Sequence, residues 1–292
     1  MKKIIILFTL FLSFYTVQAQ EAIPFTMTPS GHIVVKVSIN DVDGKFIFDT
    51  GAGLNLVTKT FYDKLKNVTT EGLFYTAFRA TGDRLDVQLY KAQHLKIGKF
   101  RYEAPTLTYL DLNWGDLDGI ISLKNFENAI VTIDYAKSVL IIEETKQLAK
   151  IKKSAKTIVP IQVEDSRNIS IDIACFVKLN DTHRGQFILD SGAGKNIFRI
   201  NSRYLSPLNI DVSDTLKVQK KTFKSDFKAN HENNIYTTTV AKLALDSNAS
   251  IAVEQQKVQF VDGLIYDGIM PIDWFGKKIT ISIPTKEIVI TE

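Results

Sequence analysis

Two aspartates stand in nearly identical surroundings. Asp49 and Asp190 each end an apolar tripeptide and each begin a run of Asp, Thr or Ser, Gly, Ala and Gly; residues 44–55 and 185–196 match without a gap, and eight of the twelve positions are identical. Two carboxyl groups held close together cannot both ionise at neutral pH, so they would share one proton. Such a pair can activate a water molecule with one carboxylate while the other protonates a carbonyl oxygen.

The residues around the aspartates fit a turn that holds a carboxylate. In each copy the apolar run predicts a buried strand that delivers the Asp to its end. The glycines that follow, Gly51 and Gly192, have no Cβ, so backbone N–H groups can approach the carboxylate oxygens. If the two copies face each other across a pseudo-twofold axis, the two carboxylates meet.

The match extends beyond these loops, which indicates an internal duplication. An Asp-Gly followed by two hydrophobic residues recurs at 118–121 and 267–270, and an alternating apolar segment recurs at 130–133 and 278–281. We therefore predict an N-terminal lobe over residues 20–142 and a C-terminal lobe over residues 158–292. The charged segment 143–157 between them is predicted to be a linker.

Most of each copy alternates between apolar and polar residues and is bounded by Gly, Asn and Asp, as is typical of strands. Helical patterns are short and follow each Asp loop. The sequence therefore predicts an all-β protein with a few short helices. It lacks the regular alternation of strands and helices that marks a parallel α/β sheet.

The paired loops resemble those of the pepsin and retropepsin superfamily of aspartic peptidases. Ala52 and Ala193, which follow the Gly of each loop, make the chain similar to the retropepsin-like branch. The run of residues 110–112 before Asp118 and Gly119 is similar to exported bacterial members with two tandem lobes. The resemblance implies a bilobed acid-protease-like fold of two homologous, closed-barrel-like lobes. It also implies an aspartic endopeptidase whose catalytic residues are Asp49 and Asp190.

Supporting roles are likewise implied by the resemblance. Thr50 and Ser191 would exchange hydrogen bonds across the lobe interface, and Gly51 and Gly192 would supply amides to the carboxylates. A flap over the cleft is expected in this family. The candidate is the hairpin of residues 75–87, with Tyr75 in one strand and Thr81, Gly82 and Asp83 at the turn; in the second copy, residues 220–234 offer no glycine tip.

The chain also departs from the family pattern. Where a Gly is expected after the two hydrophobic residues, the first copy has Ser122 and the second has Pro271. These substitutions favour the main alternative, a catalytically inactive peptide-binding protein on the same fold, which would keep main-chain recognition of an extended peptide. Retention of both Asp residues and their hydroxyl neighbours favours the active enzyme.

Other functions fit the sequence less well. A nucleotide-binding glycine loop would need a third glycine and a surrounding βαβ unit. A serine hydrolase would need a frame of Gly-x-Ser-x-Gly around Ser191, which is absent, and the four histidines lie in unrelated contexts. A β-barrel that binds a small ligand would not require acidic residues at matched positions. We predict no metal and no cofactor.

The N-terminus predicts export. Lys2 and Lys3 precede the apolar residues 4–12, and residues 17–19 form a small-residue cleavage site, so residues 1–19 are expected to be a signal peptide. The mature protein is then periplasmic or secreted. No later window is long and apolar enough for a membrane helix.

A single cysteine, Cys175, cannot close an intrachain disulfide, so the stability of the fold depends on its hydrophobic core.

Composition narrows the partners. The formal net charge of +4 is small and the basic residues are scattered, so nucleic acid is not expected as a partner. Because both halves of the predicted site lie in one chain, we expect a monomer that acts on a peptide or protein.

Ala52 and Ala193 place no hydroxyl beside the carboxylates. This predicts raised pKa values for the two carboxyl groups and activity nearer neutral than acidic pH.

Overall fold

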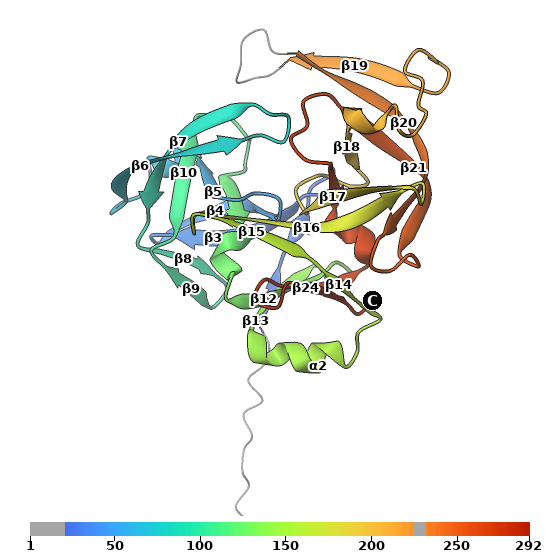
Figure 1. Cartoon of the computed structure of the whole chain (residues 1–292). Helices are drawn as coiled ribbons and strands as arrows, with labels where there is room; N and C mark the ends of the chain where they lie inside the picture. The colour runs from blue at the N-terminus through green and yellow to red at the C-terminus, as the bar shows by residue number, and fades with distance from the viewer. Residues whose placement is uncertain (1–20, 225–231) are drawn as a thin grey trace, which may run out of the picture.

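The structure is a computed structural model that describes residues 21–224 and 232–292. Most of its regular secondary structure is β-strand, arranged in two lobes that stand side by side above a third, shared sheet (Figure 1). The prediction of an all-β, bilobed, acid-protease-like fold is confirmed. The predicted signal peptide, residues 1–19, lies outside the described residues, as does part of the segment 220–234.

The N-terminal lobe is one ten-stranded sheet, drawn in blue to green in Figure 1. Nine strands follow the order β6-β7-β10-β5-β11-β4-β3-β8-β9, and β2 pairs with β3. The bounds are β2 Thr26–Met27, β3 Ile33–Ile39, β4 Val42–Asp49, β5 Asn55–Thr58, β6 Thr69–Phe78, β7 Arg84–Lys91, β8 His94–Ile97, β9 Phe100–Glu103, β10 Thr106–Leu110 and β11 Gly119–Ser122.

The C-terminal lobe is an eight-stranded sheet in the order β15-β16-β17-β22-β18-β21-β20-β19. An additional pairing of β16 with β20 closes six of these strands into a barrel. The bounds are β15 Gln162–Ser166, β16 Ser170–Leu179, β17 His183–Asp190, β18 Arg199–Asn201, β19 Gln219–Lys224, β20 Glu232–Leu245, β21 Ala252–Val261 and β22 Gly268–Pro271.

A six-stranded sheet joins the lobes, in the order β1-β13-β12-β23-β24-β14. It takes strands from both copies of the repeat, and its central pair, β12 with β23, is formed between them. The bounds are β1 Ala22–Pro24, β12 Ala129–Asp134, β13 Val139–Glu144, β14 Thr157–Pro160, β23 Lys278–Ser282 and β24 Glu287–Ile290. Neither half therefore completes this sheet alone.

The helices are short. They are α1 Lys59–Tyr62, α2 Leu148–Lys152 and the 3-10 turns η1 Leu123–Phe126, η2 Thr145–Gln147, η3 Ser202–Tyr204 and η4 Ile272–Phe275. Those that follow the Asp loops are capped alike: the Thr58 side chain accepts from the amide of Phe61, and the Asn201 side chain accepts from the amide of Arg203. The segment 143–157 holds η2 and α2, below the lobes in Figure 1.

Alternation of side chains decides which strand faces form the core. In β3, Ile33, Val35, Val37 and Ile39 are buried while the residues between them are more exposed. The same period places Phe46 and Phe48 of β4 inside and brings Asp49 to the strand end. The core thus fixes the position of the first carboxylate.

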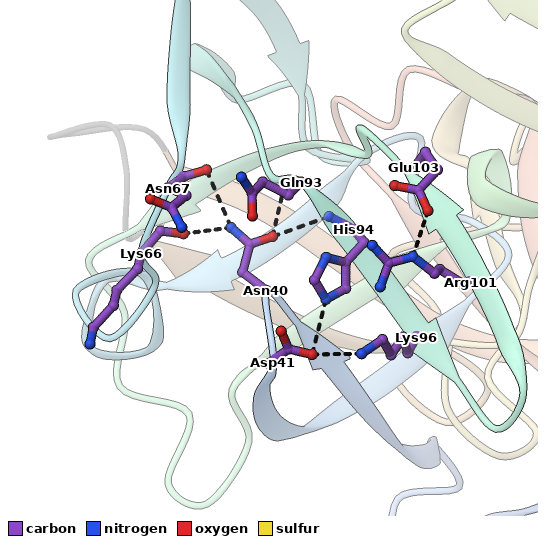
Figure 2. Close-up of polar contacts among 9 residues, drawn as sticks. All are labelled: Asn40, Asp41, Lys66, Asn67, Gln93, His94, Lys96, Arg101 and Glu103. Atoms are coloured by element: carbon purple, nitrogen blue, oxygen red, sulfur yellow. Dashed lines mark hydrogen bonds and ion pairs between the residues drawn. The ribbon is translucent and has the colours of Figure 1, made fainter.

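A polar cluster fixes the opposite end of β4 (Figure 2). Asn40 and Asp41 form the β3–β4 turn with positive φ. The Asn40 Oδ1 accepts from the amides of Gln93 and His94, and Asp41 Oδ1 contacts both His94 Nε2 (3.1 Å) and Lys96 Nζ (2.6 Å). His94 thus supports this turn through its amide and its ring.

The second lobe repeats this turn. Asn180 and Asp181 have positive φ, the Asn180 Oδ1 accepts from the amide of Lys242, and Lys242 Nζ pairs with Asp181. Both lobes therefore anchor the strand that carries the aspartate with an Asn-Asp turn and a lysine from a neighbouring strand. This part of the duplication has little sequence signal besides the dipeptide itself.

No helix among the described residues is long and apolar enough to cross a membrane.

The shared sheet supplies a test of how the lobes are coupled. Ile133 is fully buried and lies opposite Ile279 of the other half. We expect Ile133→Ala to lower the free energy of unfolding by about 2–5 kcal/mol. Ile158→Ala, at an exposed position of the same sheet, is the control and should cost far less. Chemical denaturation followed by fluorescence should show one transition; a transition confined to half the signal would contradict the coupling.

Candidate active site

The two aspartates end equivalent strands. Asp49 is the last residue of β4 and Asp190 the last of β17. Beside β4 runs the parallel strand β11, and beside β17 the parallel strand β22, so that Ser122 lies opposite Asp49 and Pro271 opposite Asp190. Each aspartate thus lies at the carboxyl end of its strand, at the equivalent position of its lobe.

The loops hold both carboxylates in the same way. The Gly51 amide donates to Asp49 Oδ1 at 2.8 Å, and the Gly192 amide donates to Asp190 Oδ1 at 2.6 Å. Each glycine also lies against the carboxylate of the other lobe: a Cβ on Gly51 would be 2.6 Å from Asp190 Cγ, and a Cβ on Gly192 would be 2.6 Å from Asp49 Cγ. No larger residue fits at either position.

Thr50 and Ser191 bind the loops to each other. The Thr50 amide donates to Ser191 Oγ and the Ser191 amide donates to Thr50 Oγ1, each at 3.0 Å. Each hydroxyl donates in turn to a carbonyl of the opposite lobe, Thr50 to Leu189 at 2.7 Å and Ser191 to Phe48 at 2.8 Å. Thr50 is fully buried and Ser191 nearly so. Four hydrogen bonds therefore fix the separation of the aspartates.

The resulting electrostatics favour a shared proton. Burial raises the pKa of Asp190 well above its usual range, and the charge and hydrogen bonding of Asp49 raise it further. The Gly192 amide and the more distant Arg199 act in the opposite direction but do not reverse the shift. The arrangement matches the chemistry of two carboxyl groups that exchange one proton.

A cavity of about 670 Å³ opens beside the first loop. Its lining combines loop residues Gly51 and Ala52, the inner face of the β6–β7 hairpin, and residues of the second lobe. Ala193, the counterpart of Ala52, is instead buried against the apolar residues of the second lobe. The cavity is therefore formed mainly on the Asp49 side, between the lobes.

The β6–β7 hairpin covers this cavity and reaches the second lobe. The Tyr75 hydroxyl and the Ser170 hydroxyl are 2.7 Å apart. At the turn, the Ile265 amide donates to the Ala80 carbonyl at 3.0 Å, and the Asn233 side chain donates to the Thr81 carbonyl at 3.3 Å. Gly82 has a positive φ and lies close to the Gly263 carbonyl, while Asp83 is buried and accepts from the Thr81 hydroxyl.

Packing beneath the first loop depends on Ser122 and on two residues that sequence reasoning missed, Asn55 and Asn125. Ser122 is fully buried; its amide donates to Asn55 Oδ1 at 3.0 Å, and its hydroxyl caps η1 by accepting from Lys124. Asn55 also exchanges hydrogen bonds with Asn125. These contacts serve the position where the family pattern has Gly. In the second lobe, Pro271 has no amide to donate and precedes η4 directly.

The second loop is longer than the first, which the gapless alignment concealed. Leu56 of β5 pairs with Ile120 of β11, whereas Arg199 of β18 pairs with Ile269, the matching residue of β22. Structurally, then, Leu56 corresponds to Arg199, although the sequence match would align it with residue 197. The loop after Asp190 is therefore two residues longer than the loop after Asp49, and Asn196 within this loop has a positive φ.

Among residues 21–224 and 232–292, no group of three or more His, Cys, Asp or Glu side chains could hold a metal ion. Cys175 is a buried, free cysteine, and burial raises the pKa of its thiol far above the usual value.

Comparison with known protein families finds a match within the first lobe. Residues 35–124 match the aspartyl protease family. The matched range begins in β3, contains Asp49 with its loop and the covering hairpin, and ends in η1. Comparison with curated proteins finds no match. The match is therefore to an aspartyl protease family and lies within the first half of the chain; Asp190 lies outside the matched range.

The crossed hydrogen bonds between the loops can be tested through stability. Thr50→Val keeps the shape of the side chain but leaves the Ser191 amide without its acceptor, so it should cost about 1–3 kcal/mol of unfolding free energy. Thr50→Ser, which retains the hydroxyl, is the matched control and should cost less. Equal loss in both variants, measured by denaturant titration, would contradict a role for the hydroxyl.

The raised pKa of Asp190 predicts a pH-dependent cost. A carboxyl whose folded pKa exceeds its unfolded value stabilises the fold below the unfolded pKa, and this contribution is lost as pH rises through the folded pKa. Asp190→Asn removes that loss. We expect the difference between the melting temperatures of the variant and the unaltered protein to shift in favour of the variant as the pH is raised from 4 to 8. A difference that does not change with pH would contradict the raised pKa of Asp190.

Proposed function

We propose that the protein is an aspartic endopeptidase in which Asp49 and Asp190 form one catalytic pair across the two lobes. The observation that carries the proposal is the crossed pairing of Thr50 and Ser191, which binds two equivalent Asp loops back to back. A protein that used only one loop would not require matched hydroxyls, matched amides and matched glycine contacts on both. The family match to residues 35–124 supports the same function.

The reaction uses the shared proton. With one carboxyl ionised and the other protonated, the carboxylate takes a proton from a water molecule lying between them, and that water attacks the peptide carbon. The protonated partner donates to the carbonyl oxygen. Collapse of the tetrahedral intermediate breaks the C–N bond as a proton is returned to the leaving nitrogen, and the pair regains its single proton.

The covering hairpin fits the role of a flap. It forms one wall of the cavity, and the few hydrogen bonds at its tip are the contacts that must break to admit an extended chain. Tyr75 would position this hairpin through its contact with Ser170. Thr81, Gly82 and Asp83 form the turn that docks on the second lobe.

We further propose that the protein is exported and acts as a monomer. The charged and apolar order of residues 1–19 supports a signal peptide, and the mature protein would then be periplasmic or secreted. Both Asp loops come from one chain and already pair with each other, so a second copy is not needed to complete the site. The substrate would be a peptide or protein, with no cofactor.

Single substitutions test the pair. Asp49→Asn and Asp190→Asn should each abolish cleavage of a diverse peptide mixture, with kcat falling at least about a thousandfold, because either change removes a group needed in the transition state. Asp43→Asn, an exposed aspartate on the same strand as Asp49, is the matched control and should cleave normally. Product formation is measured by mass spectrometry between pH 3 and pH 8.

The pH profile is part of this test. The raised pKa of Asp190 extends the singly protonated state toward neutral pH, so activity should be highest above pH 4. An optimum below about pH 4 would contradict the expectation. If the unaltered protein binds peptides but cleaves none, the substitutions at Ser122 and Pro271 mark an inactive peptide-binding protein instead.

A further inference from the structure

The surroundings of the two Asp loops differ in charge, although the loops themselves match. Gly53 and Gly194 occupy matched positions in the two loops. A Cβ on Gly53 would lie 3.8 Å from Asp172 Oδ1, and a Cβ on Gly194 would lie 4.0 Å from His32 Nε2. An acidic side chain of one lobe and an imidazole of the other therefore occupy equivalent places.

The side next to the first loop is acidic. Glu164 and Asp172 face each other directly on β15 and β16, and both line the cavity. Neither carboxylate has a hydrogen bond or an ion pair within the part of the chain that the structure describes. Like charges placed directly opposite on paired strands destabilise a sheet. A cation bound in the cavity would relieve that repulsion.

Apolar residues line the same cavity as this acidic pair, and so does Arg79 of the covering hairpin. Leu54, Leu56 and Val87 line the same cavity, as does Tyr75. Burial raises the pKa of Asp172 to about 6, and the charge of Glu164 adds to the shift. The stem of a lysine or arginine side chain would contact the apolar wall while its charged end reaches the carboxylates. The cavity is thus suited to a long basic side chain.

The side next to the second loop is basic. Arg199 takes the place that Leu56 has in the first lobe. Its neighbour Ile200 is fully buried in the core, so the alternation of the strand directs Arg199 to the opposite face. There it is half-buried and close enough to Asp190 for the two charges to interact.

Arg199 has no hydrogen-bond or ion-pair partner among residues 21–224 and 232–292. A guanidinium group offers five donors in a planar fork that matches a carboxylate. The group therefore has unused donors beside the catalytic pair. A carboxylate from the substrate would fill them.

Building on the proposed peptidase, we propose that the cleft selects peptides with a basic side chain on one side of the cleaved bond and an acidic side chain on the other. Glu164 and Asp172 recognise the basic residue, and Arg199 recognises the acidic one. These are specificity residues, because each contacts the substrate away from the reacting atoms.

Kinetic measurements on matched peptides test the proposal. A neutral peptide that the enzyme cleaves is resynthesised with Lys, Gln or Glu at each position flanking the cleaved bond. We expect kcat/KM to be about tenfold higher for Lys than for Gln on one side, and about tenfold higher for Glu than for Gln on the other. If the Gln peptides are cleaved with a kcat/KM equal to or higher than that of the Lys and Glu peptides on both sides of the bond, the proposal is overturned.

Variants assign each preference to its residues. The double substitution Glu164→Gln with Asp172→Asn should remove the Lys preference and keep the Glu preference, and Arg199→Met should do the reverse. The controls Glu254→Gln and Lys36→Met change exposed charges outside the cavity and should alter neither ratio. Loss of both preferences in every variant would overturn the assignment; melting curves identify a variant that has not folded.

The Lys preference should also depend on pH. Because the Asp172 pKa is about 6, protonation below that pH removes its charge, so the Lys preference should weaken from pH 7 to pH 5. The other titratable or charged groups near this carboxyl are Glu164 on β15, Tyr266 before β22, Tyr75 and Arg79 on the covering hairpin, and Arg167 over the Tyr75 ring. A Lys preference that is constant over this range contradicts the role of Asp172.

Failure of the proposed function can be told apart from failure of this inference. If the unaltered protein cleaves none of the peptides, the peptidase proposal fails, and fluorescently labelled versions of the same peptides then report binding. Tighter binding of the Lys and Glu peptides than of the Gln peptide, lost in the corresponding variants, would still support the charge-selective cleft. Equal dissociation constants for all three would overturn it.

Discussion

The crossed hydrogen bonds of Thr50 and Ser191 are the constraint on which the site depends. Each side chain serves as acceptor for the other loop's amide and as donor to the other loop's carbonyl, so neither loop satisfies its buried polar groups alone. Because these residues directly follow the aspartates, the same bonds set the distance between the carboxyl groups. The close contacts of Gly51 and Gly192 with the opposite carboxylates follow from that distance.

The rest of the fold holds these bonds in register. The shared sheet pairs β12 with β23 and joins the halves at the base, while the Asn-Asp turns anchor the far ends of β4 and β17. The aspartates therefore lie at the ends of strands that are fixed at both ends. A rigid frame of this kind lowers the cost of holding two carboxyl groups in contact.

Sequence reasoning reached the fold class because the strand pattern is strong and the duplication is visible. Helices were expected after both Asp loops. The structure has α1 and η3 there, with Thr58 and Asn201 as their N-caps. Residues 85–97 and 280–290 each show a strand-like pattern of apolar and polar residues, yet each forms two strands with a break between them. Periodicity alone does not reveal a turn that preserves the alternation of side chains.

The parts of the site that sequence could not supply depend on register between distant strands. Nothing in the run of residues around Arg199 indicates that it replaces Leu56, because the two extra residues of the second loop shift the alignment only in three dimensions. Likewise, Asp172 and Glu164 are unremarkable strand residues until β15 and β16 pair and face the first loop. The two halves thus keep matching Asp loops, while the positions around the loops differ in charge.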